Sequence, residues 1–299
     1  MKELLPLRGI VTVLNTPLTH DDTIDVGGLK KHVAYALDAG VSGFLVPALA
    51  SEVDKLSFAE RMTVLETVLE ANGGRVPLIA GASAPGPAER MKAARAAIAA
   101  GCDGVLVNVP FTGEDEFEDA IRHIADLAPP LLMIQDWSPG GYGLPIPLIQ
   151  HLFETIEPFR ALKIEVVPAG VKYSEVLQAT EGRLHVSGGW AVTQMIEGLD
   201  RGVHAFMPTG LHRTYTRIVA RYATGDRDGA VRLFERLLPI LAFSNQHLDL
   251  SIHFFKRLLH AQGVYATPRV REPILPFDDV HERIAGELIR RAVALEQTD

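Results

Sequence analysis

Short apolar segments alternate with amphipathic segments along the first three quarters of the sequence. The apolar segments cover residues 9–14, 43–46, 76–80, 104–109, 131–134, 160–163, 184–187 and 203–207. Near-continuous apolar segments of this kind are typical of parallel strands covered on both faces. The segments between them carry their charges on one side, which predicts helices, for example over residues 26–39 and 58–71. This alternation predicts an α/β fold, a (β/α)8 (TIM) barrel.

The pattern changes after about residue 224, where the strand-like segments cease. Residues 226–243, 248–262 and 280–297 have the periodicity of helices, and the first and last are strongly amphipathic. We therefore expect a barrel over residues 1–224 and a C-terminal three-helix extension over residues 225–299. Within the barrel, Ser57 and Glu60 have the spacing of a capping box, which predicts a helix that begins just after Ser57.

Composition places the chain among ordinary globular proteins. Its 299 residues are 47% hydrophobic and 22% charged, and the length suits one barrel with an appendage. The net charge of −8 is not that of a nucleic-acid-binding protein. The single cysteine, Cys102, cannot form an intramolecular disulfide. The sequence shows neither a signal-peptide core nor a segment long enough to span a bilayer, so we expect a cytoplasmic protein with no nucleic-acid or membrane partner.

Lys163 ends the sixth apolar segment and is the first candidate for chemistry. The strand ends of such a barrel gather at one face, where catalysis takes place. Desolvation disfavours the ammonium form of a lysine, and the neutral amine can add to a ketone to form an imine, which acts as an electron sink. The alternative is a lysine whose stem packs against the protein while its charged head reaches solvent.

Polar residues also follow the second and fifth apolar segments. The backbone at Ala50 and Ser51 can hold a carboxylate, and Glu52 can transfer protons; alternatively, the serine and glutamate only cap the next helix. Gln135 can donate and accept hydrogen bonds but cannot titrate, so it can position a group and cannot move a proton. Asp136 can act as a base, but we favour a role in closing a turn.

Glu165 lies two residues beyond Lys163, so both side chains point the same way if the strand continues. A neighbouring carboxylate favours the charged lysine, and it would also stabilise an iminium cation. The alternative for Glu165 is a surface ion pair with Lys172. Gly188 and Gly189 end the seventh segment, where glycines allow positive φ and leave room for a ligand carboxylate. The histidines lack the spacing of a metal site, so we expect neither a metal nor an organic cofactor.

Taken in order, these residues resemble the dihydrodipicolinate synthase and N-acetylneuraminate lyase superfamily of Schiff-base aldolases and dehydratases. The resemblance is carried by residues 9–12 with Thr16-Pro17, by residues 56–61 and 77–81, and by the lysine of strand six. It implies a (β/α)8 barrel with a helical C-terminal part, and Lys163 as the residue that forms the imine. It also implies a small-molecule 2-keto acid as substrate and a homo-oligomer, a tetramer or a dimer.

Two departures from the superfamily pattern indicate a subtype. The Gly-Thr-Thr-Gly-Glu motif is here residues 48–52, Ala-Leu-Ala-Ser-Glu, and the tyrosine at the end of strand five is Gln135. The loss of the phenol and of both threonine hydroxyls argues against dihydrodipicolinate synthase activity. The Ser-Glu, Gln-Asp and Lys-x-Glu pattern resembles that of the 2-keto-3-deoxy-L-arabinonate dehydratases of this superfamily.

We therefore expect a Schiff-base lyase that dehydrates a 2-keto-3-deoxy sugar acid, as in the conversion of 2-keto-3-deoxy-L-arabinonate to 2,5-dioxopentanoate. Glu52 is the first candidate for the base and Glu165 the second. The expected catalytic residues are Lys163, Glu52, Gln135 and Glu165, and the expected substrate-binding residues are Ala50, Ser51, Asp136, Gly188 and Gly189. A pyruvate-dependent class I aldolase with an unknown aldehyde partner and a non-catalytic sugar-acid-binding barrel remain alternatives.

Overall fold

The computed structural model describes residues 2, 4–138 and 140–297 of the chain. Its eight strands follow one another in sequence order, β1-β2-β3-β4-β5-β6-β7-β8, in a closed barrel, and the recorded pairs are parallel. The predicted (β/α)8 barrel is therefore confirmed. The strands are β1 (Gly9–Val13), β2 (Gly43–Leu45), β3 (Leu78–Gly81), β4 (Gly104–Val107), β5 (Leu132–Ser138), β6 (Phe159–Val166), β7 (His185–Gly188) and β8 (Ala205–Phe206).

Helices follow the strands in the order that the amphipathic segments predict. They are α1 (Val26–Asp38), α2 (Phe58–Asn72), α3 (Pro87–Ala99), α4 (Glu114–Ala125), α5 (Ile146–Thr155), α6 (Ala169–Ala179), α7 (Met195–Asp200), α8 (His212–Ala223), α9 (Arg227–Ser244), α10 (Leu248–Ala261) and α11 (Asp279–Gln297). Short 3-10 turns occupy Leu49–Ser51, Val53–Lys55 and Trp190–Gln194. Helices α9–α11 confirm the helical C-terminal extension, while the division of the chain between residues 224 and 225 stays a prediction.

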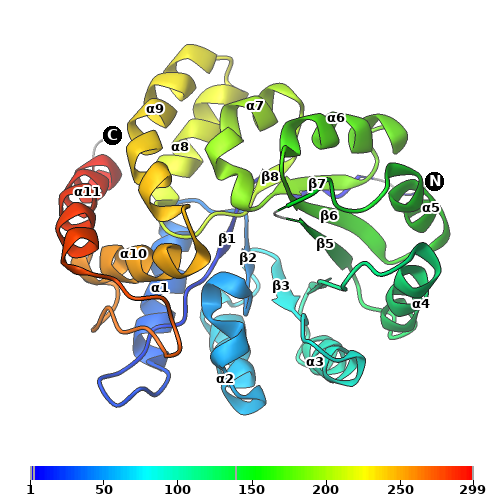
Figure 1. Cartoon of the computed structure of the whole chain (residues 1–299), viewed down its shortest axis with the longest axis horizontal. Coiled ribbons are helices and arrows are strands. Elements are labelled where there is room, and N and C mark those ends of the chain that lie inside the picture. The colour runs from blue at the N-terminus through cyan, green and yellow to red at the C-terminus, as the bar shows by residue number, and fades with distance from the viewer. Residues whose placement is uncertain (1, 3, 139, 298–299) are drawn as a thin grey trace. The chain divides into compact units, whose positions relative to one another are not determined.

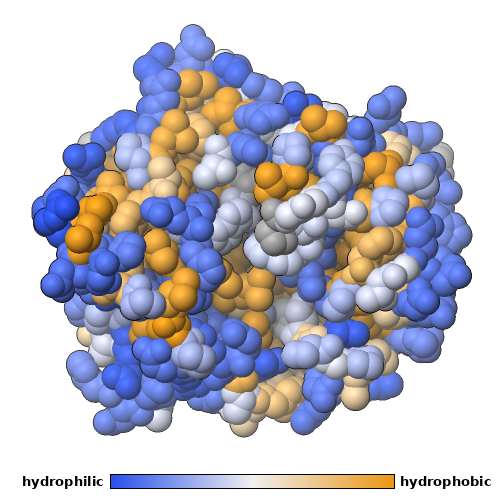
Figure 2. Space-filling view, in the orientation of Figure 1, coloured by the Kyte–Doolittle hydropathy of each residue, from blue (hydrophilic) through white to orange (hydrophobic). Residues whose placement is uncertain are grey.

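Two compact units make up the chain, namely Met1–Gly9 with Pro77–Met207, and Ile10–Val76 with Pro208–Asp299. The first unit contains β3–β8 and α3–α7, and in Figure 1 α4, α5 and α6 flank β5 and β6 on the outside. Its strands are buried on both faces, as their continuous apolar sequence predicts. Hydrophilic side chains dominate the right-hand edge of the view in Figure 2, while α5 buries an apolar stripe of Leu148, Ile149, Leu152 and Phe153.

The paired strands β5 and β6 extend further than their apolar segments predict. The pairing runs from Leu132 opposite Phe159 to Ser138 opposite Val166, so it continues past the expected ends at residues 134 and 163. Gln135 and Glu165 are buried and hydrogen-bonded to each other, and Asp136 is buried and paired with Lys172 of α6, which allows these polar residues to remain in the sheet. The candidate site residues of this unit therefore lie on strands, where their direction is fixed.

The second unit contains most of β1, all of β2, and helices α1, α2 and α8–α11. Helix α2 begins as its capping box predicts: the Glu60 carboxylate accepts a hydrogen bond from the Ser57 backbone N–H at 2.8 Å, and the Ser57 hydroxyl accepts one from the Glu60 backbone N–H at 3.3 Å. In the part of the chain that the structure describes, no helix has both the length and the apolar character needed to cross a membrane.

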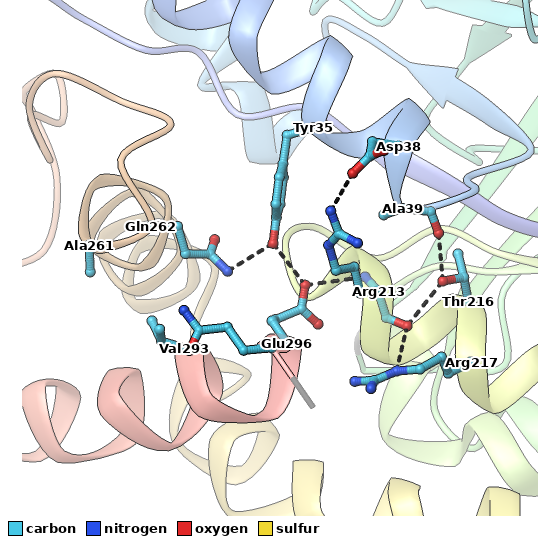
Figure 3. Close-up of a pocket in the computed structure, with 11 residues that line it drawn as sticks. Tyr35, Asp38, Ala39, Arg213, Thr216, Arg217, Ala261, Gln262, Val293 and Glu296 are labelled. Atoms are coloured by element: carbon cyan, nitrogen blue, oxygen red, sulfur yellow. Dashed lines mark hydrogen bonds and ion pairs between the residues drawn. The ribbon is translucent and has the colours of Figure 1, made fainter. Parts of the chain in front are cut away.

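Glu296 near the end of α11 fastens this last helix to α8, beside a pocket of about 520 Å³ (Figure 3). The buried carboxylate accepts hydrogen bonds from the backbone N–H groups of Arg213 (3.2 Å) and Thr214 (2.8 Å), and from the Tyr35 hydroxyl (3.1 Å). The first N–H groups of a helix have no partner within the helix and carry partial positive charge. A carboxylate from α11 therefore caps α8.

Candidate active site

Lys163, Glu165 and Gln135 meet in the first unit and form the centre of the candidate site. Lys163 Nζ lies 3.1 Å from Glu165 Oε2, and the Gln135 amide donates a hydrogen bond to the same oxygen. The other oxygen, Oε1, accepts a hydrogen bond from the Trp190 backbone N–H at 2.8 Å. The side chains of Lys163, Glu165 and Gln135 are all buried. The Gln135 amide and the Trp190 backbone N–H thus hold the Glu165 carboxylate beside Lys163 Nζ.

This geometry settles two alternatives that the sequence left open. Lys163 is only 5% exposed, so its head does not reach bulk solvent. Glu165 pairs with Lys163 and makes no surface ion pair with Lys172, so that alternative was wrong. The expectation that Lys163 and Glu165 point the same way is confirmed, because β6 continues to Val166.

Gly189 leaves the space that Glu165 occupies. A Cβ atom on Gly189 would lie 2.1 Å from Glu165 Oε1, and one on Gly188 would lie 2.7 Å from the Tyr173 hydroxyl oxygen. Neither glycine has a positive φ, and the φ of Gly189 is −101°, so the positive φ that glycine allows is not used at these positions. These glycines are required because side chains approach them closely; their role in binding a substrate carboxylate stays a prediction.

Asp136 points away from Gln135, as alternation along a strand requires, and is buried on the other side of β5. Its carboxylate forms an ion pair with Lys172 Nζ at 2.5 Å and accepts a hydrogen bond from the Leu144 backbone N–H at 3.0 Å. Burial raises the pKa of the Asp136 carboxyl and lowers the pKa of the Lys172 ammonium, while the attraction between the two opposes both shifts. The expected turn closed by Asp136 was wrong, because β5 continues through it.

Sequence reasoning placed Lys172 wrongly, at the surface, and did not single out Ser187. Lys172 lies on the inner side of α6, with buried Ala169, Tyr173 and Val176 at helical spacing, and that stripe was the available signal. Ser187 is the register partner of Lys163 on β7, as Gln135 is on β5. The position of Ser187 becomes visible only when the strand pairing is known.

Ala50 and Ser51 lie in the second unit, in the 3-10 turn after β2. The Ser51 hydroxyl accepts a hydrogen bond from the Ala48 backbone N–H at 3.0 Å and donates one to the Leu14 carbonyl at 2.6 Å. The Ala50 carbonyl accepts a hydrogen bond from the Asn15 side chain at 2.7 Å. Ser51 therefore shapes its own loop, and the binding of substrate by Ala50 and Ser51 stays a prediction.

Glu52 is also in the second unit and is almost fully buried. Its carboxylate forms an ion pair with Lys256 of α10 and accepts a hydrogen bond from the Arg271 backbone N–H at 2.8 Å. Burial lowers the pKa of Lys256, and the charge of Glu52 opposes this shift. Neither Ser51 nor Glu52 caps α2, whose N-cap is Ser57. The contacts of Glu52 are those of an anchor for the C-terminal segment.

The chain matches one known protein family over almost its whole length. The model of the dihydrodipicolinate synthetase family matches residues 6–292. The chain belongs to this family. The resemblance that we drew from the motifs is therefore confirmed, and with it the assignment to the Schiff-base lyases of the superfamily.

Relatives within the dihydrodipicolinate synthetase family carry two activities. The 4-hydroxy-tetrahydrodipicolinate synthase of Methanosphaerula palustris is 27% identical over 289 residues, which cover 91% of this chain and 94% of the relative. The L-2-keto-3-deoxyarabonate dehydratase of Azospirillum brasilense is also 27% identical, over 302 residues that cover 97% of this chain and 94% of the relative.

A solved structure gives the same fold. The dihydrodipicolinate synthase of Rhodopseudomonas palustris superposes with a TM-score of 0.88 at 21% identity, covering 97% of this chain and all of that one. At this identity the likeness supports the fold alone. The choice between synthesis and dehydration therefore depends on the side chains of the site.

Proposed function

We propose that the protein dehydrates a 2-keto-3-deoxy sugar acid through an imine at Lys163, as in the conversion of 2-keto-3-deoxy-L-arabinonate to 2,5-dioxopentanoate. One observation carries the proposal: the Gln135 amide holds the Glu165 carboxylate against Lys163 Nζ. Gln135 stands on strand five, at the position where the synthases of this superfamily have a tyrosine. The dehydratase of Azospirillum brasilense is a relative of matching length, which supports the same reading.

The reaction begins when the neutral Lys163 amine adds to the C2 ketone and water leaves, which gives an iminium. The cation acidifies the C3 hydrogens, and Glu165 removes one of them as a proton to form an enamine. The electron pair of the enamine then expels the C4 hydroxyl, which takes up a proton and leaves as water. Tautomerisation places a carbonyl at C5, and hydrolysis of the iminium returns Lys163 and releases the product.

Glu165 is better placed as the base than Glu52, our first candidate from the sequence. Its carboxylate lies 3.1 Å from the nitrogen that would carry the iminium, close to the carbon that must lose a proton. Glu52 has its carboxylate engaged by Lys256 and Arg271. We therefore assign proton transfer to Glu165 and anchoring to Glu52.

Gln135 tilts the reaction towards elimination. Cleavage of the C3–C4 bond requires a base that removes the proton of the C4 hydroxyl, and an amide cannot serve as that base. Its hydrogen bond to Glu165 instead orients the carboxylate. Gln135 is thus a positioning group in this mechanism.

An aldolase that makes or uses pyruvate is the second candidate. The observation in its favour is the synthase activity of several relatives, for example the enzyme of Methanosphaerula palustris. An aldolase would use the same imine at Lys163, with another polar group in place of the phenol.

Product analysis separates the two candidates. With 2-keto-3-deoxy-L-arabinonate, a dehydratase releases 2,5-dioxopentanoate, whereas an aldolase releases pyruvate and glycolaldehyde. Lys163→Ala should abolish either reaction, and Lys31→Ala, at an exposed lysine of α1, is the matched control. Pyruvate as the sole product would overturn the dehydratase proposal, and turnover by Lys163→Ala would overturn both candidates.

A further inference from the structure

We propose that Asp136 and Lys172 form a buried latch that fixes residues 142–144 as one wall of a pocket beside Gln135, and that this wall selects the part of the substrate beyond C4. The inference rests on the proposed function only in taking the substrate to be a keto acid bound through Lys163. Asp136 is then a positioning residue and does not bind substrate directly.

The latch forms hydrogen bonds with both ends of the segment 142–144. Lys172 Nζ donates hydrogen bonds to the carbonyl oxygens of Tyr142 (2.5 Å) and Leu144 (2.7 Å), while it pairs with Asp136 Oδ2 at 2.5 Å. Asp136 Oδ1 accepts the hydrogen bond from the Leu144 backbone N–H at 3.0 Å. Lys172 is fully buried, so water does not compete for these contacts.

Gly143 supplies an observation that is independent of charge. Its φ is +73°, and a Cβ atom there would lie 2.2 Å from Asp136 Oδ1 and 2.7 Å from Val166 Cγ1. The segment therefore lies directly against Asp136 at the one residue that lacks a side chain. A larger residue would lift the segment away even with the ion pair intact.

Helix α6 also holds the side chain of Tyr142. The Tyr142 hydroxyl donates a hydrogen bond to Glu175, and its ring centroid lies 5.0 Å from Lys172 Nζ. Two contacts from α6 thus set the position of this aromatic side chain, in addition to the hydrogen bond from Lys172 to the Tyr142 carbonyl. The attraction between a cation and an aromatic ring contributes to this arrangement.

The segment lines a pocket of about 560 Å³ that also includes Gln135. Its other walls come from Asn108 and Phe111 after β4 and from Trp137 of β5. Gln135 contacts Glu165 and also lines this pocket, so a substrate chain that extended from Lys163 past Gln135 would reach its aromatic walls. Because a buried ion pair adds little net stability, the latch is better explained by the wall it positions than by the stability of the fold.

Two variants that act by different routes test the latch. Lys172→Met removes the charge and keeps the length, while Gly143→Ala lifts the segment and keeps the charges; Lys31→Met on α1 is the matched surface control. The kcat/KM for five-carbon and six-carbon 2-keto-3-deoxy acids is measured as total turnover, whichever product forms. Both variants should lose about 10- to 100-fold with the five-carbon acid and change the ratio between the two acids, because small misplacements near a substrate are costly.

Two further readouts keep the outcome clear. Imine formation with pyruvate, trapped by borohydride, should be unchanged in both variants, because a three-carbon chain ends before the pocket. Hydrogen exchange of the Leu144 backbone N–H should accelerate in both variants and not in Lys31→Met, with or without any turnover. An unchanged ratio between the acids in folded Lys172→Met and Gly143→Ala, or unchanged exchange at Leu144, would overturn the latch. A wild-type protein that yields only pyruvate would overturn the dehydratase proposal and leave the test of the latch intact.

Discussion

In the proposed mechanism, the Glu165 carboxylate takes the proton-transfer role that the family resemblance gives to a tyrosine in related enzymes. It accepts hydrogen bonds from the Gln135 amide and the Trp190 backbone N–H, and it lies 3.1 Å from Lys163 Nζ. Charge-assisted hydrogen bonds of this kind fix direction as well as adding energy. The carboxylate is therefore oriented before a substrate arrives, which is the condition for efficient proton transfer.

Glu165→Gln keeps the shape of the side chain and removes its ability to accept a proton. We expect kcat for dehydration to fall by about 10²–10⁴-fold, the usual contribution of general acid–base catalysis. Trapping of the imine by borohydride should persist, because Lys163 is still present. Steady-state kinetics and peptide mass spectrometry measure the two effects. A variant that kept more than a tenth of its turnover would show that another group is the base.

At the scale of residues, the candidate site residues were easier to predict from the sequence than the partners with which they pair. Lys163 and Glu165 could be placed on one side of a strand because alternation needs only local geometry. The partner of Asp136 could not be predicted, because Lys172 is 36 residues away in the sequence and becomes a neighbour only through packing of α6 on β5 and β6. Pairing of distant charges is a property of the fold.

At the scale of elements, the apolar segments predicted the strands, and their ends were less well predicted. Strands β5 and β6 continue through Gln135, Asp136 and Glu165 because buried partners satisfy these polar groups. A sequence pattern treats polar residues as the end of a buried strand. The strand ends were therefore predicted wrongly at the candidate site, where buried polar residues are concentrated.

The C-terminal segment depends on a buried ion pair between Glu52 and Lys256. Removing one partner leaves the other charge buried and unpaired, which typically costs about 3–5 kcal/mol. We expect Glu52→Gln and Lys256→Met each to lower the free energy of unfolding measured in urea. The double variant should recover much of that stability, and with it the turnover lost by Glu52→Gln.

This double variant also separates an anchor from a base. If Glu52 transferred protons, neutralising Lys256 could not restore turnover. A double variant as inactive as Glu52→Gln alone, although stably folded, would contradict the anchoring role. Lys31→Met again serves as the control for removing a lysine charge at an exposed site.

At the scale of the whole molecule, the periodicity of the sequence was sufficient to predict the barrel, and short motifs carried the resemblance to its family. The family match over residues 6–292 agrees with a resemblance drawn from short motifs. The subtype was harder to predict, because relatives with different reactions share the same fold and are equally similar to this chain, at 27% identity. The reaction depends on a few side chains, and a fold can host many of them. The homo-oligomer and the cytoplasmic location stay predictions.

Buried neutral histidines should make the protein sensitive to acid. In the second unit His32 and His212 contact each other through their Nε2 atoms at 2.9 Å, and both are fully buried. Burial lowers the pKa of His212 to about 3 and the pKa of His32 well below its usual value. In the first unit burial likewise lowers the pKa of His185 to about 3 and that of His204 to about 4.

Because these folded-state pKa values lie below the unfolded value, the unfolded chain binds more protons in acid. Their stabilising contribution is complete above a pH of about 6.5 and is lost as the pH falls from there, by about 1.4 kcal/mol per pH unit for each histidine. Urea unfolding at pH 7.5 and pH 5.5 measures this loss. His212→Asn should reduce the dependence of the free energy of unfolding on pH by the contribution of one histidine. A stability that did not change between these pH values would contradict the buried neutral histidines.

The central claim is that the Lys163 amine bonds to the keto carbon of the substrate. Reduction with sodium borohydride in the presence of pyruvate, followed by peptide mass spectrometry, tests it most directly. The account predicts a stable pyruvate-derived adduct on Lys163 and on no other lysine. An unmodified Lys163 under these conditions, or an adduct that persisted in Lys163→Ala, would contradict it.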